Sequence, residues 1–232
     1  MAAFATRSTQ ALAERARSLF PAEVGLGVAQ LGEGRSSDLL AAESAGSTRM
    51  VPARAAEFIA GRLALRRAQQ ALSVACFPVP NATDRSPQWP AGFCGSISHA
   101  CGLAVAVLAH RSDGLQSLGI DIEDDAPLSA DLHDIVLVQE EQSALSARVD
   151  ASRKAKIMFA AKEAVYKAQY PLTGKLFGFD QITVTLLSPT GCFDARFKAD
   201  ILPFQAGSRV AGRYSTGDGL VVAGVCLGAM RD

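Results

Sequence analysis

The chain has 232 residues, of which 49% are hydrophobic and 20% are charged. This composition is that of a globular protein with a substantial apolar core, and it excludes a disordered or low-complexity chain. There are 23 lysines plus arginines and 23 aspartates plus glutamates, and this zero net charge argues against a dedicated nucleic-acid-binding protein.

The first half of the chain predicts one long helix followed by a loop and two strands. The first 20 residues include Glu14 and have no continuous apolar stretch, which predicts a weakly amphipathic helix rather than a signal peptide. Residues 52–74 have helical spacing of apolar positions and begin with a proline. A proline-rich loop at 77–92 leads to predicted strands at 93–97 and 103–109.

The second half also combines helices with strands. A short strand is predicted at 117–123, and helical spacing is found at 132–147 and 152–170. The remaining predicted strands are 181–187, 192–198 and 220–227. Because helices and strands alternate without regular βαβ spacing, the pattern favours an α+β fold over a doubly wound sheet.

Two features predict the cellular setting. The longest apolar runs, 103–109 and 220–230, are shorter than the ~18–20 residues that a membrane-spanning helix requires. The five cysteines are scattered and form no C-x-x-C pair. We therefore expect no membrane span, reduced thiols and a cytoplasmic location.

The charged residues fall into three blocks. Five arginines lie between Arg49 and Arg67, nine acidic residues lie between 119 and 150, and six basic residues lie between 153 and 175. Such blocks are usually solvated surfaces. The alternative is that the basic blocks hold a polyanionic ligand and the acidic block holds a hard cation.

The segment Gly119–Glu123 is a candidate metal site. In a strand, residues i and i+2 share a face, so Asp121 and Glu123 project together while Ile120 and Ile122 face the core. Oxygen-only ligands favour Mg²⁺ over Zn²⁺. From spacing alone, the simpler interpretation is two solvent-facing acids at the end of a strand.

The predicted helix at 152–170 carries Glu163 and Lys167, which are four residues apart and therefore share a helix face. The simpler interpretation is an exposed ion pair worth about 0.2–0.5 kcal/mol. The functional interpretation makes Glu163 a third metal ligand or a general base and makes Lys167 a phosphate ligand.

The segment Gly95–His99 predicts a tight turn whose serine hydroxyls, backbone N–H groups and histidine can hold a phosphate oxyanion. An ordinary turn and a core histidine are alternatives. A hydrolase built on Ser98, His99 and Asp121 is a further alternative, although the G-x-S-x-G motif of such enzymes is missing.

Taken together and in this order, the motifs closely resemble those of the Sfp-type 4′-phosphopantetheinyl transferases. Within that family they look most like the branch that includes the enterobactin-synthetase component. The motifs are R-x-x-E-F-x-x-G-R (54–62), R-x-P-x-W-P (85–90), G-S-I-S-H (95–99), G-I-D-I-E (119–123) and F-x-x-K-E-x-x-Y-K-A (159–168), with further matches at 170–174 and 177–179. One departure is Ala160, where the family usually has Ser, Thr or Cys.

The resemblance implies an enzyme that moves the phosphopantetheine arm of coenzyme A onto a serine of an acyl or peptidyl carrier protein and releases 3′,5′-ADP. Such carriers often serve siderophore or other secondary metabolism. It implies Mg²⁺ held by Asp121, Glu123 and Glu163, with Glu163 also as the base and Lys167 neutralising the pyrophosphate, so that Asp121, Glu163 and Lys167 form the catalytic set. The further residues that it assigns to coenzyme A are Arg54, Arg62, Arg85, Ser96, Ser98, His99 and Phe177.

The resemblance also implies an α+β fold of two similar halves, residues 1–115 and 116–232, related by a pseudo-twofold axis. Coenzyme A would lie in the cleft between the halves, and the chain would act as a monomer without nucleic acid. Two other functions remain open, namely a non-catalytic module that binds coenzyme A or a carrier protein, and the Ser/His hydrolase acting on coenzyme A derivatives.

Overall fold

A computed structural model describes residues 8–47, 50–187 and 189–228, so Arg49 of the predicted basic block lies outside the described residues. The helices are α1 (Thr9–Arg17), α2 (Ala41–Ser47), α3 (Pro52–Ala71), α4 (His133–Val136), α5 (Gln139–Leu145) and α6 (Ala151–Thr173). The strands are β1 (Gly25–Gln30), β2 (Phe93–Ala100), β3 (Leu103–His110), β4 (Leu115–Asp124), β5 (Ile182–Leu187), β6 (Cys192–Phe197), β7 (Arg209–Gly217) and β8 (Leu220–Gly228).

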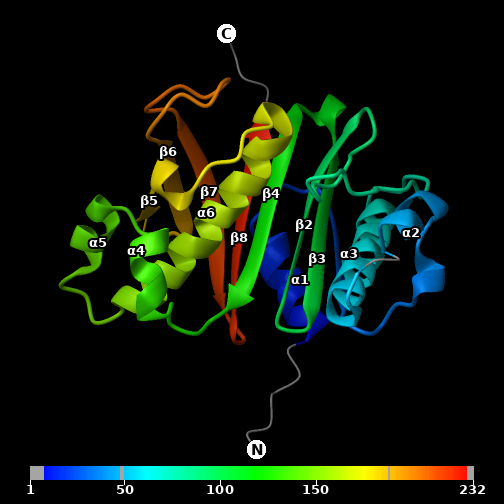
Figure 1. Ribbon diagram of the computed structural model, residues 1–232, viewed down its shortest axis with the longest axis horizontal. Coiled ribbons are helices and arrows are strands. Elements are labelled where there is room, and N and C mark those ends of the chain that lie inside the picture. Colours follow the sequence, from blue (N-terminus) through cyan, green and yellow to red (C-terminus); the bar gives the residue numbers. More distant parts are fainter. Residues whose placement is uncertain (1–7, 48–49, 188, 229–232) are drawn as a thin grey trace, which may run out of the picture.

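The strands form two antiparallel sheets, each covered by one long helix (Figure 1). The three-stranded sheet has the order β1-β3-β2 and packs against α3. The five-stranded sheet has the order β4-β8-β7-β6-β5 and packs against α6. This mixture of helices and antiparallel sheets confirms the predicted α+β class.

Helix α6 approaches β4 very closely at Gly119. A Cβ atom at this position would lie 1.9 Å from the carbonyl oxygen of Ala164, so only glycine fits beneath the helix. Close packing here brings the polar face of α6 to the side chains of β4. The motif G-I-D-I-E therefore has a packing function at its first residue as well as carboxylates at its third and fifth.

The two sheets meet where β2 lies beside β4 (Figure 1). Serine side chains link the two strands at this boundary. The Oγ atom of Ser96 accepts a hydrogen bond from the backbone N–H of Ile120 at 3.1 Å, and that of Ser98 accepts one from Ile122 at 3.4 Å. The candidate residues of β2 and β4 are therefore fixed next to one another.

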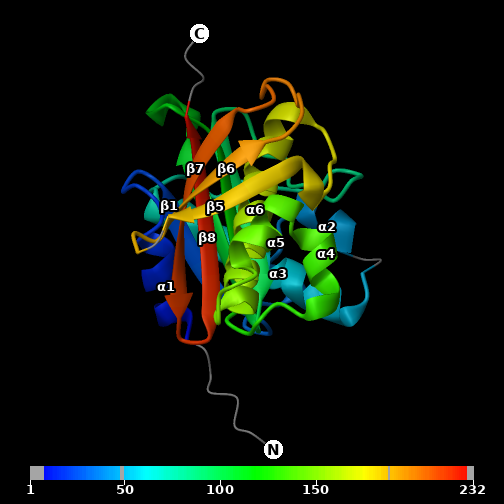
Figure 2. The same cartoon turned by 90° about the vertical axis from the view of Figure 1, so that its left-hand side faces the viewer.

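Helix α1 connects the two sheets on the face opposite α3 and α6 (Figure 2). Its Arg15 forms an ion pair of 2.6 Å with Asp218, which follows β7. Beneath α1, one apolar cluster combines Leu12, Val105 and Ile120 with other buried side chains from both sheets. The two sheets therefore share an apolar core.

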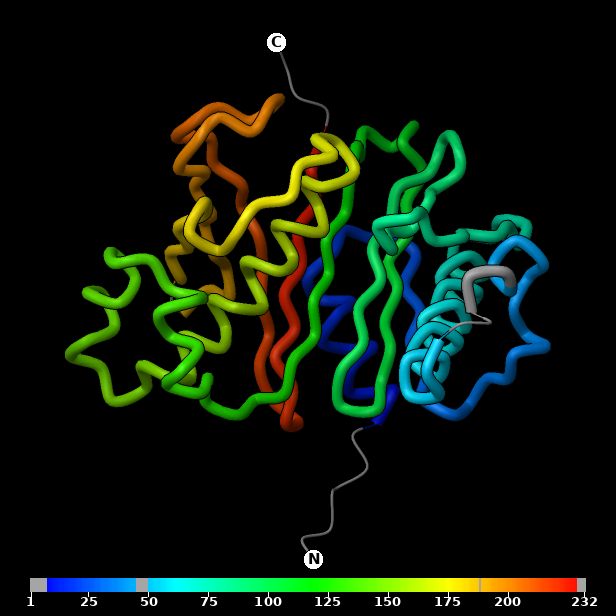
Figure 3. Tube along the Cα trace, in the orientation of Figure 1, coloured from blue at the N-terminus to red at the C-terminus, as the bar shows by residue number. Residues whose placement is uncertain are grey.

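The loop at residues 72–92 runs from α3 to β2 (Figure 3). Its Asp84 accepts a hydrogen bond from the hydroxyl of Tyr170, near the C-terminal end of α6. A β-bridge between Asn81 and Pro87 makes the middle of this loop a small hairpin. The loop therefore forms a wall over the junction of the two sheets.

Most predicted elements are confirmed, but several are corrected. The helix predicted at 132–147 is interrupted at Leu137 and Val138, which separate α4 from α5. The segment Gly95–His99 belongs to strand β2 and is not a turn. The elements β1, α2 and β7 were not predicted. The boundary at 115/116 and the pseudo-twofold axis stay predictions, although the strands change sheet between β3 and β4.

No helix in the described part of the chain is both long and apolar enough to span a bilayer.

Candidate functional site

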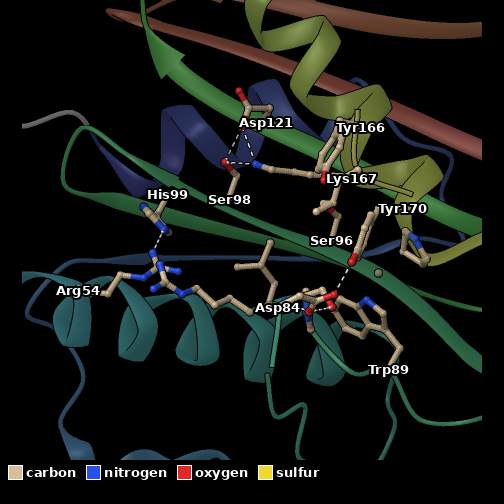
Figure 4. Close-up of a pocket in the computed structure, with 17 residues that line it drawn as sticks. Arg54, Asp84, Trp89, Ser96, Ser98, His99, Asp121, Tyr166, Lys167 and Tyr170 are labelled. Carbon is tan, nitrogen blue, oxygen red and sulfur yellow. Dashed lines mark hydrogen bonds and ion pairs between the residues drawn. The ribbon is translucent and has the colours of Figure 1, made fainter. Parts of the chain in front are cut away.

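A cavity of about 430 Å³ lies between β2, the C-terminal half of α6 and the loop that precedes β2 (Figure 4). Five of the predicted site residues line it together, although each comes from a different segment of the chain. They are Arg54, Arg85, His99, Asp121 and Lys167. Ser96 and Ser98 also line the cavity, so most of the residues singled out in the sequence meet here.

Asp121 on β4 is the centre of the polar contacts in this cavity, although only 4% of it is exposed. Its Oδ1 atom accepts hydrogen bonds from Lys167 Nζ at 2.6 Å and from Ser98 Oγ at 2.9 Å. Lys167 Nζ is also 3.0 Å from Ser98 Oγ. The other carboxylate oxygen, Oδ2, is buried and has no hydrogen-bond partner among the described residues.

Glu123 and Glu163 provide two further carboxylates near Asp121. Burial raises the pKa of Glu123, and the negative charge of Asp121 raises it further. Burial likewise raises the pKa of Glu163, and Lys167 opposes this increase. The donors are all oxygen atoms, and together with the unpaired Oδ2 of Asp121 they fit a hard cation in type. Among the described residues, however, no three His, Cys, Asp or Glu side chains are grouped closely enough to hold a metal ion.

Glu163 lines a second, smaller cavity of about 140 Å³, together with Tyr166 and Phe177. Tyr166 lines both cavities and therefore stands between them. The ring of Phe177 packs edge-on against that of Tyr166, with 5.4 Å between the ring centres. The structure thus groups Phe177 with Glu163 and places Lys167, one helical turn later, on the larger cavity.

His99 and Arg54 contact each other at the edge of the larger cavity. Burial lowers the pKa of His99, so its imidazole is neutral near pH 7 and can accept a hydrogen bond from the Arg54 guanidinium. Ser98, in contrast, bonds to Asp121 and Lys167. In the described part of the chain, Ser98 and His99 therefore do not form the dyad that the hydrolase alternative requires.

Arg62 does not line the cavity, because its side chain is buried inside the first half of the molecule. Its Nη2 donates to Asn81 Oδ1 at 2.6 Å, and its guanidinium lies 4.3 Å from the ring centre of Phe58. Burial lowers its pKa to about 10, and the nearby carboxylate of Glu43 opposes that change. The structure therefore separates Arg62 from Arg54, and its assignment to coenzyme A stays a prediction.

Glu43 is a buried carboxylate to which the sequence analysis assigned no role. It accepts hydrogen bonds from the Arg66 guanidinium at 2.6 Å and from the backbone N–H of Val79 at 2.9 Å. These bonds tie α2 to α3 and to the loop that forms the cavity wall.

Lys162 is likewise buried, with 1% exposed, and lies next to the candidate base in sequence. Its ammonium group donates to Glu141 Oε2 at 2.8 Å and to the carbonyl oxygens of Val136 and Phe179 at 2.7 and 3.1 Å. The Glu141 carboxylate also accepts from the N–H of Val184 at 2.6 Å. Lys162 therefore fixes α6 to α4, α5 and β5, and it does not line the larger cavity.

Several further residues line the larger cavity without having been assigned a role. Among them are Asp84, Trp89, Tyr166 and Tyr170. Three of these four stand inside motifs at 85–90, 159–168 and 170–174, so the motifs were the signal that could have found them. Asp84 lies just before such a motif, and a hydrogen bond from Ser86 contributes most to lowering its pKa to about 2.

Two family models match the chain, one on each side of residue 115. The model described as "4'-phosphopantetheinyl transferase N-terminal domain" matches residues 42–109. The model described as "4'-phosphopantetheinyl transferase superfamily" matches residues 117–212.

Curated relatives carry the same name. The chain is 34% identical over 193 residues to 4'-phosphopantetheinyl transferase Svp of Streptomyces mobaraensis. This match covers 81% of this chain and 78% of that protein. It is 32% identical to 4'-phosphopantetheinyl transferase PptT of Mycobacterium tuberculosis, over 77% of this chain and 82% of that protein. It is also 35% identical to enterobactin synthase component D of Salmonella typhi, over 59% of this chain and 57% of that protein. These matches confirm the family resemblance, and the chain belongs to the 4′-phosphopantetheinyl transferases.

Proposed function

We propose that this enzyme transfers the phosphopantetheine arm of coenzyme A to a serine of an acyl or peptidyl carrier protein and releases 3′,5′-ADP. The observation that carries the proposal is the contact of Asp121 with Lys167 and Ser98 inside a cavity that Arg54 and Arg85 also line. A buried carboxylate paired with one cation, next to further cations, suits a substrate that carries several phosphates.

The proposed reaction forms a bond between the serine oxygen and the β-phosphorus and breaks the bond from that phosphorus to the bridging oxygen of the pyrophosphate. Negative charge then accumulates on the leaving 3′,5′-ADP. Lys167 would neutralise this charge, and Arg54 and Arg85 would bind the nucleotide phosphates through charge-assisted hydrogen bonds. His99, which is neutral and held by Arg54, would add a hydrogen-bond contact to a phosphate.

We further propose that Asp121, Glu123 and Glu163 hold Mg²⁺. When bound, the ion would supply positive charge to the pyrophosphate. The support is the unpaired oxygen of Asp121 and an oxygen-only donor set in which burial, and then the charge of Asp121, raise the pKa of Glu123 and of Glu163. The contribution of the chain is to place these anionic side chains on two elements that pack against each other, β4 and α6, despite their repulsion.

Glu163 is the proposed base that accepts the proton of the incoming serine hydroxyl. Burial raises its pKa, and a carboxylate whose pKa is raised towards neutrality is a better base at physiological pH. Its place on α6, one turn from Lys167, would let the base reach the serine hydroxyl while Lys167 contacts the pyrophosphate.

The carrier substrate is proposed to belong to siderophore or other secondary metabolism, because a relative is named enterobactin synthase component D. We propose a monomer that acts in the cytoplasm, a setting in which the five cysteines stay reduced as thiols.

The deciding experiment incubates the protein with Mg²⁺, an apo peptidyl carrier domain and coenzyme A labelled in its pantetheine arm. The carrier should gain one phosphopantetheine group by mass spectrometry, with one equivalent of 3′,5′-ADP released. Binding of coenzyme A without transfer would favour the non-catalytic module. Consumption of a coenzyme A derivative without any labelled carrier would favour the hydrolase.

A further inference from the structure

A direct hydrogen bond joins the two walls of the larger cavity. The hydroxyl group of Tyr170, near the C-terminal end of α6, donates to Oδ2 of Asp84 in the loop before β2 (Figure 4). Both residues line the cavity, and so does Arg85, which follows Asp84 directly. The bond therefore connects the helix that carries Lys167 to the loop that carries Arg85.

Asp84 also fixes the conformation of its own loop. Its Oδ1 atom accepts hydrogen bonds from the backbone N–H of Ser86 at 2.9 Å and from the Ser86 hydroxyl at 2.7 Å. Between these two residues, Arg85 has a φ of 71°, a left-handed conformation that residues other than glycine rarely adopt. One carboxylate thus holds both the unusual backbone of Arg85 and the attachment of the loop to α6.

We propose that Tyr170 is a positioning residue for coenzyme A binding. It acts through Asp84, which holds the loop so that Arg85 and Trp89 remain in the cavity wall. The inference rests on the proposed function, because it takes coenzyme A as the ligand of this cavity. It adds a role for the conspicuous tyrosine of the 170–174 segment, which lies one helical turn beyond Tyr166 and stacks on it at 5.8 Å between ring centres.

The test uses Tyr170→Phe, Asp84→Ala and the double variant, with Tyr214→Phe as the matched control. The chain has three tyrosines, and Tyr214 lies on β7 and does not line the larger cavity. Two quantities are measured. The first is the steady-state kinetics at saturating carrier protein, which give both KM for coenzyme A and kcat. The second is acrylamide quenching of Trp89, the single tryptophan of the chain, in the ligand-free protein.

We expect Tyr170→Phe and Asp84→Ala each to raise KM for coenzyme A by about 5- to 10-fold and to change kcat by less than about 2-fold. The double variant should be no worse than the more impaired single variant, because both remove the same attachment. Quenching of Trp89 should increase in all three variants, while Tyr214→Phe should match the wild type in both measurements.

An unchanged KM and unchanged quenching in Tyr170→Phe would overturn the proposal. Additive increases in KM would also overturn it, because Tyr170 would then act through its own contact with the ligand. A wild-type protein that transfers nothing to any carrier would instead refute the proposed function. Even in that case, quenching in the free protein would still show whether Tyr170 holds the loop.

Discussion

Lys167 and Asp121 form an ion pair of 2.6 Å in which only one of the two carboxylate oxygens takes part. The second oxygen is buried and has no partner among the described residues. Buried carboxylate oxygens normally have a hydrogen-bond donor or a cation beside them. The second oxygen of Asp121 is therefore able to accept a hydrogen bond or to bind a cation. The pair therefore suggests that Asp121 is held ready for a further ligand, not merely neutralised by Lys167.

Replacing Asp121 by Asn tests this arrangement with little change of shape. The variant keeps hydrogen-bonding groups but loses the charge, so transfer should fall by at least about 100-fold because the stabilisation of phosphate charge is lost. Turnover and melting temperature are measured together across Mg²⁺ concentrations. Asp125→Asn is the control, since Asp125 pairs with the half-exposed Arg153 and does not line the larger cavity. Near-normal turnover of Asp121→Asn at saturating Mg²⁺ would contradict the metal assignment.

Glu163→Gln should abolish transfer while making the protein more stable at alkaline pH. Burial raises the pKa of Glu163 in the folded protein above its ordinary value of 4.5. At pH values between 4.5 and the raised pKa, the folded protein therefore binds a proton at Glu163 more readily than the unfolded chain does. Wild-type stability therefore falls as the pH rises through the raised pKa, and glutamine removes this loss.

The melting temperature of Glu163→Gln should exceed that of the wild type at pH 8, and the difference should shrink towards pH 4.5. If Glu163 is the base, single-turnover transfer should stay low at every Mg²⁺ concentration. Full recovery of the rate at high Mg²⁺ would leave Glu163 as a metal ligand alone.

Lys162→Met should destabilise the fold by about 3–5 kcal/mol, because it leaves the buried carboxylate of Glu141 without its cation. Lys154→Met is the matched control. Lys154 pairs with the half-exposed Asp150, and such pairs contribute less than about 1 kcal/mol. Urea unfolding monitored by circular dichroism measures both. Equal effects of the two substitutions would contradict the structural role of Lys162.

Arg62→Ala separates two roles for this arginine. Loss of its buried contacts with Asn81 and Glu43 should lower the free energy of unfolding by about 2–4 kcal/mol. Arg153→Ala, which removes an exposed partner of Asp125, should cost less than about 1 kcal/mol.

The predicted binding role of Arg62 is tested by calorimetry below the melting temperature. Affinities for coenzyme A and for dephospho-coenzyme A, which lacks the 3′-phosphate, are compared between the variant and the wild type. Unchanged discrimination would show that Arg62 does not read that phosphate, and Arg54 would be the next candidate.

The three blocks of charged residues are visible in the sequence, but the pairing of their members is not. The acidic block was interpreted either as solvated surface or as a cation site, yet many of its members pair with the basic block that follows. Examples are Asp121 with Lys167, Asp125 with Arg153 and Glu141 with Lys162. One sequence cannot reveal which acids are buried, because burial is decided by the strands and helices packed around them.

The missed strand β1 has a local physical cause. Its sequence starts Gly25-Leu26-Gly27, and glycine weakens the strand pattern. Position 27 nevertheless requires glycine, since a Cβ atom there would lie 2.1 Å from the carbonyl oxygen of Ala64 on α3. The packing of α3 against β1 thus explains why Gly27, which weakens the strand pattern, is present at this position.

More of the candidate site than of its surroundings could be predicted from the sequence. Alternation along β4 correctly placed Ile120 and Ile122 in the core, with both side chains almost fully buried, and turned Asp121 towards the other face. The partners of Asp121 could not be deduced in this way. Ser98 and Lys167 reach it from β2 and α6, and their distances depend on how the two sheets and the helix pack.

The apolar core beneath α1 has a consequence for how substrates enter and leave. Side chains such as Leu12, Val105 and Ile120 interlock across the junction of the two sheets, so opening this junction would expose apolar surface to water. The large rotations that separate loosely connected domains are therefore disfavoured in this enzyme. We expect ligand exchange to proceed through movements of loops and side chains, while the two sheets keep their positions relative to each other.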